Sequence, residues 1–175
     1  QACEKMIEEY QKEFDLSYTI LRYGSLYGPR ANEFNSISNV LLQALKNKKI
    51  VRRGDGEEIR EYIHVKDAAQ LSVNALDEKY INKNLIITGN QQIKIKDLLL
   101  MIREMLNNKV TIEYIDERME GHYEITPYTF RPRVAKKYIP DTQFDLGQGI
   151  LDTIYDVYKE LNNSDDKKPV VSLPD

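Results

Sequence analysis

The stretch LRYGSLYGPR (residues 21–30) decides the fold, because it places the end of an apolar strand directly before a turn rich in glycine and proline. Residues 16–23 form an apolar, β-branched run of strand length, which predicts a buried parallel strand. In open α/β sheets, ligands bind beyond the carboxyl ends of the strands. Tyr23, Ser25 and Tyr27 are therefore placed to meet a ligand, although the same segment could equally form a simple turn.

A second informative stretch, RGDGEEIREYIHVKD (residues 53–67), lies roughly 30 residues further along the chain. Arg60 lies here in a strand-like run among apolar neighbours. An arginine in that setting needs an anionic partner, and its planar guanidinium offers paired hydrogen bonds to phosphate. The alternative is a salt bridge with Glu57, Glu58 or Glu61, which periodicity alone favours.

The remaining pattern alternates helices and strands. Apolar side chains at helical spacing predict helices over residues 1–13, 35–47, 68–76, 96–106 and 147–161. Strand-like runs cover residues 50–53, 59–65, 84–88 and 110–115. We expect Ser36 and Asp67 to be N-caps, and the first two strands to form a hairpin or a sharp reversal through residues 54–56. Alternation of this kind predicts an α/β protein with a partly parallel sheet.

Residues 117–145 fit no periodic pattern and contain Pro127, Pro132 and Pro140. Long segments without regular structure are uncommon in compact domains and are often functional. We therefore expect this segment to form a wall of the active site. The polar tail, residues 164–175, is expected to be disordered.

Composition argues against several kinds of partner. The net charge is −3, without the basic excess that a nucleic-acid surface requires. The single cysteine, Cys3, and the absence of zinc-ligand spacing predict a reducing cytoplasm and no metal. No apolar run approaches the roughly 20 residues that span a bilayer, so we expect no membrane association. The chain starts at Gln1 within a helical pattern that has no cap, which suggests a truncated protein.

Together, the two stretches resemble the extended short-chain dehydrogenase/reductases, a family of NAD-dependent nucleotide-sugar epimerases and dehydratases that includes UDP-glucose 4-epimerase. The family pattern is R-x-x-N-x-Y-G-P followed by G-D-G-x-x-x-R-D-[YF]-[IV]-x-V-x-D, and both parts are matched here in order, apart from Ser25 and Glu61. The resemblance covers about residues 1–105. It aligns residues 1–4 with the positions after the family's catalytic Tyr-x-x-x-Lys. That pair and the glycine-rich dinucleotide loop are therefore expected upstream of Gln1.

Two other Tyr-x-x-x-Lys strings begin at Tyr62 and Tyr155. The first lies in a predicted strand, where residues four apart are roughly 13 Å distant and cannot cooperate directly. The second lies in the last helix, where we expect Tyr155 to pack into the core. We therefore assign no catalytic residue within the chain.

The resemblance implies the C-terminal part of a Rossmann-type parallel sheet plus a small α/β substrate-binding domain. By position, residues 1–30 and 60–92 supply the last elements of the NAD-binding Rossmann domain. Residues 31–59 and 93–163 then form the nucleotide-sugar-binding domain.

The implied activity is that of the substrate-binding half of an NAD-dependent nucleotide-sugar epimerase or dehydratase, which acts by transient hydride transfer at the sugar. The full-length enzyme is expected to be a homodimer that pairs through the helix of residues 1–13, and the fragment alone is expected to be inactive. One alternative is a reductase or decarboxylase on the same scaffold. Another is a non-catalytic module for nucleotide-sugar binding or for assembly.

The resemblance also assigns binding residues by position. Tyr23, Gly24 and Leu26 are expected beside NAD. The nucleotide diphosphate sugar is expected to contact Ser25, Tyr27, Asn35, Val51, Arg53, Arg60, Arg131 and Arg133. In this scheme Arg60 and one of the two loop arginines converge on the diphosphate, because a dianion needs more than one cation for tight binding.

Three residues depart from the family pattern. Ser25 replaces an asparagine that contacts the substrate, and Glu61 replaces the usual aspartate. Arg53 replaces an apolar or aromatic residue beside the base, so the identity of the base stays open. We expect His64 and His122 to be structural or exposed.

Overall fold

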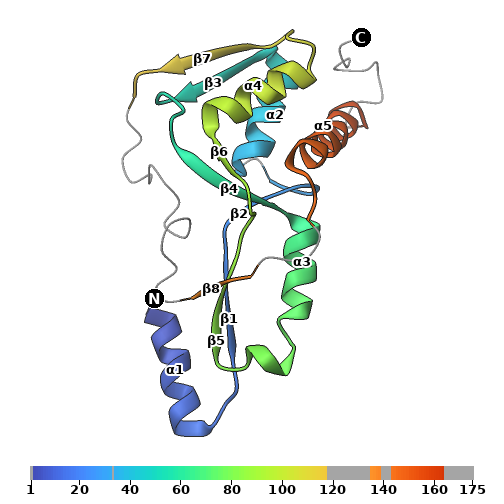
Figure 1. Ribbon diagram of the computed structural model, residues 1–175. Helices are drawn as coiled ribbons and strands as arrows, with labels where there is room; N and C mark the ends of the chain where they lie inside the picture. Colours follow the sequence, from blue (N-terminus) through green and yellow to red (C-terminus); the bar gives the residue numbers. More distant parts are fainter. Residues whose placement is uncertain (1, 33, 118–134, 139–142, 164–175) are drawn as a thin grey trace.

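The computed structural model describes residues 2–32, 34–117, 135–138 and 143–163, and it has an α/β fold (Figure 1). The elements in chain order are α1 (Ala2–Phe14), β1 (Thr19–Tyr23), β2 (Ser25–Tyr27), α2 (Ser36–Asn47), β3 (Lys49–Arg53), β4 (Ile59–His64), α3 (Val65–Asn74), the 3-10 helix η1 (Glu78–Tyr80), β5 (Lys83–Ile87), β6 (Gln92–Lys94), α4 (Ile95–Met105), β7 (Thr111–Ile115), β8 (Lys136–Lys137) and α5 (Leu146–Asn163). All five predicted helices and all the predicted strands are present.

One sheet has the order β1-β5-β8, and all its strands are parallel. Helix α1 lies beside this sheet, on the side away from α3 (Figure 1). The Nε atom of Arg22 on β1 donates to the Oε1 atom of Glu4 on α1 at 2.7 Å. No residue of α1 is buried. The helix is thus held to the sheet mainly at its first turn, and its apolar face is left exposed.

The second sheet has the order β2-β4-β6 and brings the two informative stretches together. Strand β2 pairs in parallel with β4, which places Ser25 beside Tyr62 and Tyr27 beside His64. Strand β6 closes the sheet in the antiparallel direction, with Arg60 opposite Ile93. Two segments that are distant in sequence therefore end at the same edge of one sheet.

The expected hairpin between residues 50–53 and 59–65 is wrong. Strand β3 pairs in parallel with β7, while β4 belongs to the second sheet. Gly54 and Gly56 do adopt positive φ values, of 81° and 74°. These turns redirect the chain from one sheet to another instead of reversing it within a sheet, because the backbone of Gly56 and Glu58 bonds to the start of α4.

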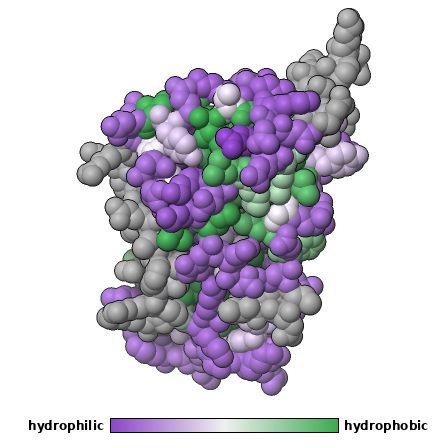
Figure 2. All heavy atoms as spheres, turned by 45° about the horizontal axis from the view of Figure 1, so that its top comes forward, coloured by the Kyte–Doolittle hydropathy of each residue, from purple (hydrophilic) through white to green (hydrophobic). Residues whose placement is uncertain are grey.

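The main hydrophobic core lies between the second sheet and helices α2, α4 and α5. Its fully buried members include Leu41, Leu45, Ile50, Leu99, Ile102 and Ile150. A smaller cluster under α3 contains Ile63, Ala68, Leu71 and Ile87. Figure 2 shows a face on which hydrophilic residues predominate, with apolar residues in an irregular strip through its middle.

Helix capping differs from the sequence expectation by one to three residues. Asn35, not Ser36, caps α2, because the Asn35 side chain accepts hydrogen bonds from the backbone nitrogens of Ile37 and Ser38. His64, not Asp67, caps α3, since the helix already begins at Val65.

Tyr155 was expected in the core, but its side chain is 50% exposed. It lies on the solvent side of α5, where the Nζ atom of Lys159 is 4.2 Å from the ring centroid. The short elements η1, β6 and β8 were not expected, because two or three residues are too few to show a period.

Two glycines mark points where neighbouring segments approach each other closely. A Cβ atom on Gly24, between β1 and β2, would overlap the side chain of Thr88. A Cβ atom on Gly89 would overlap the carbonyl oxygen of Tyr62. The segment after β5 therefore crosses β4 at a place where a side chain has no room. Among the described residues, no helix is both long enough and apolar enough to cross a bilayer.

Candidate functional site

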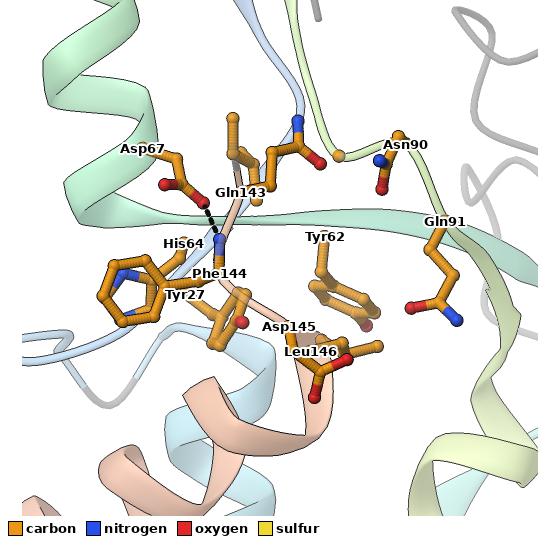
Figure 3. Close-up of a pocket in the computed structure, with 12 residues that line it drawn as sticks. Tyr27, Tyr62, His64, Asp67, Asn90, Gln91, Gln143, Phe144, Asp145 and Leu146 are labelled. Atoms are coloured by element: carbon orange, nitrogen blue, oxygen red, sulfur yellow. Dashed lines mark hydrogen bonds between the residues drawn. The ribbon is translucent and has the colours of Figure 1, made fainter. Parts of the chain in front are cut away.

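A cavity of about 270 Å³ lies at the carboxyl ends of β2 and β4, beside the segment that follows β5 (Figure 3). Ligands of open α/β sheets bind at this edge. The walls come from the ends of the two motif strands, the crossing segment and the start of α5. The lining residues are Tyr27, Tyr62, Ile63, His64, Asp67, Gly89, Asn90, Gln91, Gln143, Phe144, Asp145 and Leu146.

Aromatic stacking joins the two motif strands to the start of α5. The ring of His64 stacks on Phe144 with centroids 4.4 Å apart, and Tyr27 meets His64 edge-on at 5.3 Å. The backbone nitrogen of Phe144 donates to the Oδ2 atom of Asp67 at 2.9 Å, the dashed line in Figure 3. Tyr27, which the sequence already placed near a ligand, thus belongs to an aromatic cluster built from β2, the end of β4 and the segment before α5.

The electrostatics of the cavity favour uncharged or cationic groups. Asp67 and Asp145 line it, while its described lining residues include no lysine or arginine. Burial, and then the nearby carboxylates of Asp67, Asp145 and Asp152, raise the pKa of Tyr27. Its hydroxyl therefore remains protonated at neutral pH. A diphosphate is not expected to enter this cavity and needs a cationic site elsewhere.

Arg60 supplies a cation on the same strand, two residues before Tyr62. Its side chain is partly buried, and the Nη1 atom donates to the carbonyl oxygen of Ile59 at 2.9 Å. Arg60 does not line the cavity. Because alternate residues of a strand point to the same face, Arg60 and Tyr62 share a face of β4.

Comparison with known proteins agrees with this geometry. Residues 1–87 match the family described as "NAD dependent epimerase/dehydratase family". The chain belongs to this family. It is 29% identical over 150 residues to a putative UDP-glucose 4-epimerase of Methanocaldococcus jannaschii, covering 84% of this chain and 48% of the relative. It is 28% identical over 159 residues to a UDP-N-acetyl-alpha-D-glucosaminuronate decarboxylase of Bacillus cytotoxicus, covering 85% of this chain and 48% of that one.

Solved structures agree on the fold of this epimerase/dehydratase chain. A UDP-glucuronic acid 4-epimerase from Bacillus cereus, in complex with UDP-glucuronic acid and NAD, superposes with a TM-score of 0.76 at 22% identity. The match covers 90% of this chain and 50% of the other. The chain thus spans about half the length of these relatives, and the fold expected from sequence, a Rossmann-like α/β arrangement with parallel sheets, is confirmed.

Within this epimerase/dehydratase chain, the residues expected beside NAD lie around the end of β1. Tyr23 and Leu26 are exposed, and the Tyr23 hydroxyl hydrogen-bonds to the Ser72 hydroxyl. The nitrogen of Gly24 donates to the carbonyl oxygen of Ile87 at 2.8 Å, which ties the bend to β5. The side chains of Tyr23 and Leu26 therefore both reach solvent near this bend.

The residues expected to contact the nucleotide fall into two groups. Asn35 is joined to the motif strands, because its Nδ2 atom donates to the carbonyl oxygen of Leu26 at 2.8 Å. Val51 and Arg53 lie on β3, in another sheet, and Arg53 pairs with Glu117 at 3.3 Å. Among the described residues, no hydrogen bond or ion pair joins the side chains of Val51 and Arg53 to Ser25 or Tyr27. Arg131 and Arg133 lie outside the described residues.

Sequence reasoning missed several residues of the cavity. Asp67 was visible as the last residue of the family motif but was interpreted only as a helix cap. Phe144 falls in residues 117–145, the segment expected to form a wall of the active site, but no local signal singled out this residue. The Nε2 atom of Gln143 is buried without a hydrogen-bond partner among the described residues. Within the residues that the structure describes, no group of three or more histidine, cysteine or acidic side chains could hold a metal ion.

Proposed function

We propose that this chain is the substrate-binding half of an NAD-dependent enzyme that epimerises or dehydrates the sugar of a nucleotide diphosphate sugar. The observation that carries the proposal is the parallel pairing of Ser25–Tyr27 with Tyr62–His64, which joins both family motifs at one sheet edge next to Arg60. A chance occurrence of either motif would not require the two strands to be neighbours.

In this proposal Arg60 binds the diphosphate. Its guanidinium is partly buried on β4, where desolvation strengthens a charged hydrogen bond relative to one in bulk water. The acidic cavity beyond Tyr62 rejects phosphate and therefore orients the ligand, with its charged part at Arg60. Either Arg131 or Arg133 would provide the second cation. Ser25, beside Tyr62 in the sheet, would contact the sugar.

NAD would be contacted by Tyr23, Gly24 and Leu26. The fit rests on the exposed side chains at the bend: Tyr23 precedes Gly24, Leu26 follows it by two residues, and both offer surface on which a planar ring can pack. When bound, NAD would accept a hydride from the sugar and return it. The general base is proposed to lie outside these 175 residues, since Tyr62 is buried and Tyr155 lies on the solvent side of α5.

The test is a binding measurement on the chain itself. Isothermal titration calorimetry with UDP-glucose and dTDP-glucose should give a dissociation constant roughly tenfold to a hundredfold larger for Arg60→Met than for the parent chain, because a charged hydrogen bond contributes about 1.5–3 kcal/mol. Lys109→Met removes the same charge at an exposed position and should bind like the parent. Equal affinity of the parent and Arg60→Met would refute the assignment.

A second candidate activity is decarboxylation of a nucleotide-linked uronic acid. It is favoured by the similarity to the Bacillus cytotoxicus decarboxylase, which is nearly as great as the similarity to the epimerase. The protein that contains this chain together with the dinucleotide-binding half would release carbon dioxide from a UDP-uronic acid under this alternative. Epimerisation would leave the carbon count of the sugar unchanged.

We also propose that the full-length protein is a homodimer that pairs through α1. The groove beside this helix has an almost wholly apolar lining formed by Met6, Ile7, Tyr10 and Leu16. An exposed surface of this kind typically marks an interaction site.

A further inference from the structure

His64 occupies the point where three elements of the fold meet. It is the last residue of β4 and the cap of α3, and its ring contacts both β2 and the segment before α5. Only 2% of the residue is exposed, although it can carry a charge near neutral pH. The proposed nucleotide-sugar chemistry assigns it no role.

The hydrogen bonding of His64 fixes its protonation state. The Nδ1 atom accepts a hydrogen bond from the backbone nitrogen of Lys66 at 3.3 Å, as an N-cap side chain does. An accepting Nδ1 has no proton, so the neutral ring carries its proton on Nε2. The Nε2 atom is buried and has no hydrogen-bond partner among the described residues. A second proton would have to enter at Nδ1 and would face the N–H group of Lys66.

The ring also holds the start of α5 in place. Its face stacks on Phe144 (Figure 3), and the interplanar angle is 25°. Phe144 is fixed from the other direction by the hydrogen bond from its backbone to Asp67. Asp67 belongs to α3, whose first turn His64 caps. The helix cap, the ring stacking and the backbone hydrogen bond therefore connect His64, Phe144 and Asp67 to one another at the cavity wall.

We propose that His64 is a proton-sensitive positioning residue. In its neutral form it holds the first turn of α3 and residues 143–145 together beside Tyr27. Protonation removes the cap acceptor and places a positive charge at the N-terminal end of a helix, where the helix dipole is also positive. The start of α5 is then released and the cavity opens. This proposal does not depend on the identity of the ligand.

The charged groups around the ring act in both directions. Asp67 on α3 and Asp152 on α5 favour the charged form, while burial and Lys66 disfavour it. A charged imidazole would also interact favourably with the Phe144 ring, but the Nζ atom of Lys66 already lies 5.3 Å from that ring's centroid. Burial is the largest influence, and the pKa of His64 lies below its ordinary value of 6.5.

The direction of the pH effect follows from linkage. A histidine whose pKa is lowered by the closed arrangement binds fewer protons there than in the open one. Closure is therefore fully favoured above pH 6.5 and weakens as the pH falls from 6.5 towards the lowered pKa. Over that interval the open population grows by up to about tenfold per pH unit. Below the lowered pKa, titration of His64 changes the open population no further.

The test measures hydrogen-exchange protection factors of the Lys66 and Phe144 amides between pH 7.5 and 5, in the chain without nucleotide. Both should fall together below pH 6.5, by up to about tenfold per pH unit. His64→Asn keeps a neutral cap acceptor that cannot titrate, so its protection factors should stay flat. His122→Gln removes the other histidine and should preserve the fall.

A second measurement covers the case in which His64→Asn fails to fold. Carbon-13 labelling of the two histidines lets the titration of His64 be followed in the unaltered chain, with His122→Gln to assign the signals. The His64 signal should titrate below pH 6.5 together with the Phe144 ring signals. A parent chain with constant protection factors, a His64 pKa above 6.5, or an equal fall in His64→Asn would overturn the proposal.

Discussion

Helix α4 buries Ile95, Leu98, Leu99 and Ile102, whereas α1, which is of similar length and also amphipathic, buries no residue. Helix α4 completes a core with α2, α5 and the second sheet. Helix α1 lies against a sheet that covers little of it, and its apolar side chains Met6, Ile7, Tyr10 and Phe14 stay exposed. An amphipathic pattern thus predicts that a helix has an apolar face, but not that the chain itself contains what covers that face.

The largest effect is expected from Leu99→Ala. Leu99 is 0% exposed in the core, so its truncation should lower the free energy of unfolding by about 2–5 kcal/mol. The next residue of the same helix, Leu100, is 38% exposed, and Leu100→Ala should cost well under 1 kcal/mol. Urea unfolding of the two variants measures the contrast. Equal losses would show that burial in α4 does not control stability.

An intermediate effect is expected from Lys137→Met on β8. Lys137 donates to the carboxylate of Glu61 at 3.0 Å, and the Glu61 side chain is only 2% exposed. In the variant, the buried carboxylate of Glu61 keeps Gln92, at 3.5 Å, as its side-chain partner among the described residues, which should cost about 2 kcal/mol.

The double variant Glu61→Gln with Lys137→Met separates charge from packing. Because it removes both charges, it should recover much of the stability that Lys137→Met loses, as measured by urea unfolding. If the double variant is as unstable as the single one, the pair does not join the two sheets through its charges.

The smallest effect on unfolding is expected from Ile7→Ser on α1, within about 0.5 kcal/mol, because the side chain is exposed. Its effect should appear in association. Sedimentation velocity across a range of concentrations should show less self-association than for the parent chain. Lys5→Ser, an exposed polar position in the same helix, should sediment as the parent does. Unchanged association in Ile7→Ser would count against pairing through α1.

The elements of this fold followed from sequence wherever their apolar pattern was long. The helices and the strands Thr19–Tyr23 and Lys83–Ile87 are examples, because several periods of side chains report burial. The partner of each strand was harder to predict. Residues 50–53 were expected to form a hairpin or a sharp reversal with residues 59–65, yet β3 pairs with Thr111–Ile115, since strand pairing depends on distant residues. Helix caps were misplaced because neighbouring residues such as Asn35 and Ser36 have similar capping chemistry.

The candidate site was predictable only where a motif reached it. Tyr27 and Arg60 lie in the two linked motifs, and the structure places their strands side by side. Phe144 and Gln143 lie in the segment expected to form a wall of the active site, but they could not be singled out, because they reach the cavity through tertiary packing and carry no local pattern. The roles given to Arg131 and Arg133 stay predictions, and so do the two domain ranges.

The close approach of Gly24 and Thr88 has a consequence for recombining this chain with its relatives. The space that a side chain would fill at residue 24 is already filled by the hydroxyl of Thr88, which comes from the end of a different strand. The two positions therefore share a single volume. A chimera whose junction falls between residues 24 and 88 inherits one half of that volume from each parent. Such an exchange keeps the β1–β5 pairing only if the residue that one parent supplies at position 24 and the residue that the other supplies at position 88 fit this volume together.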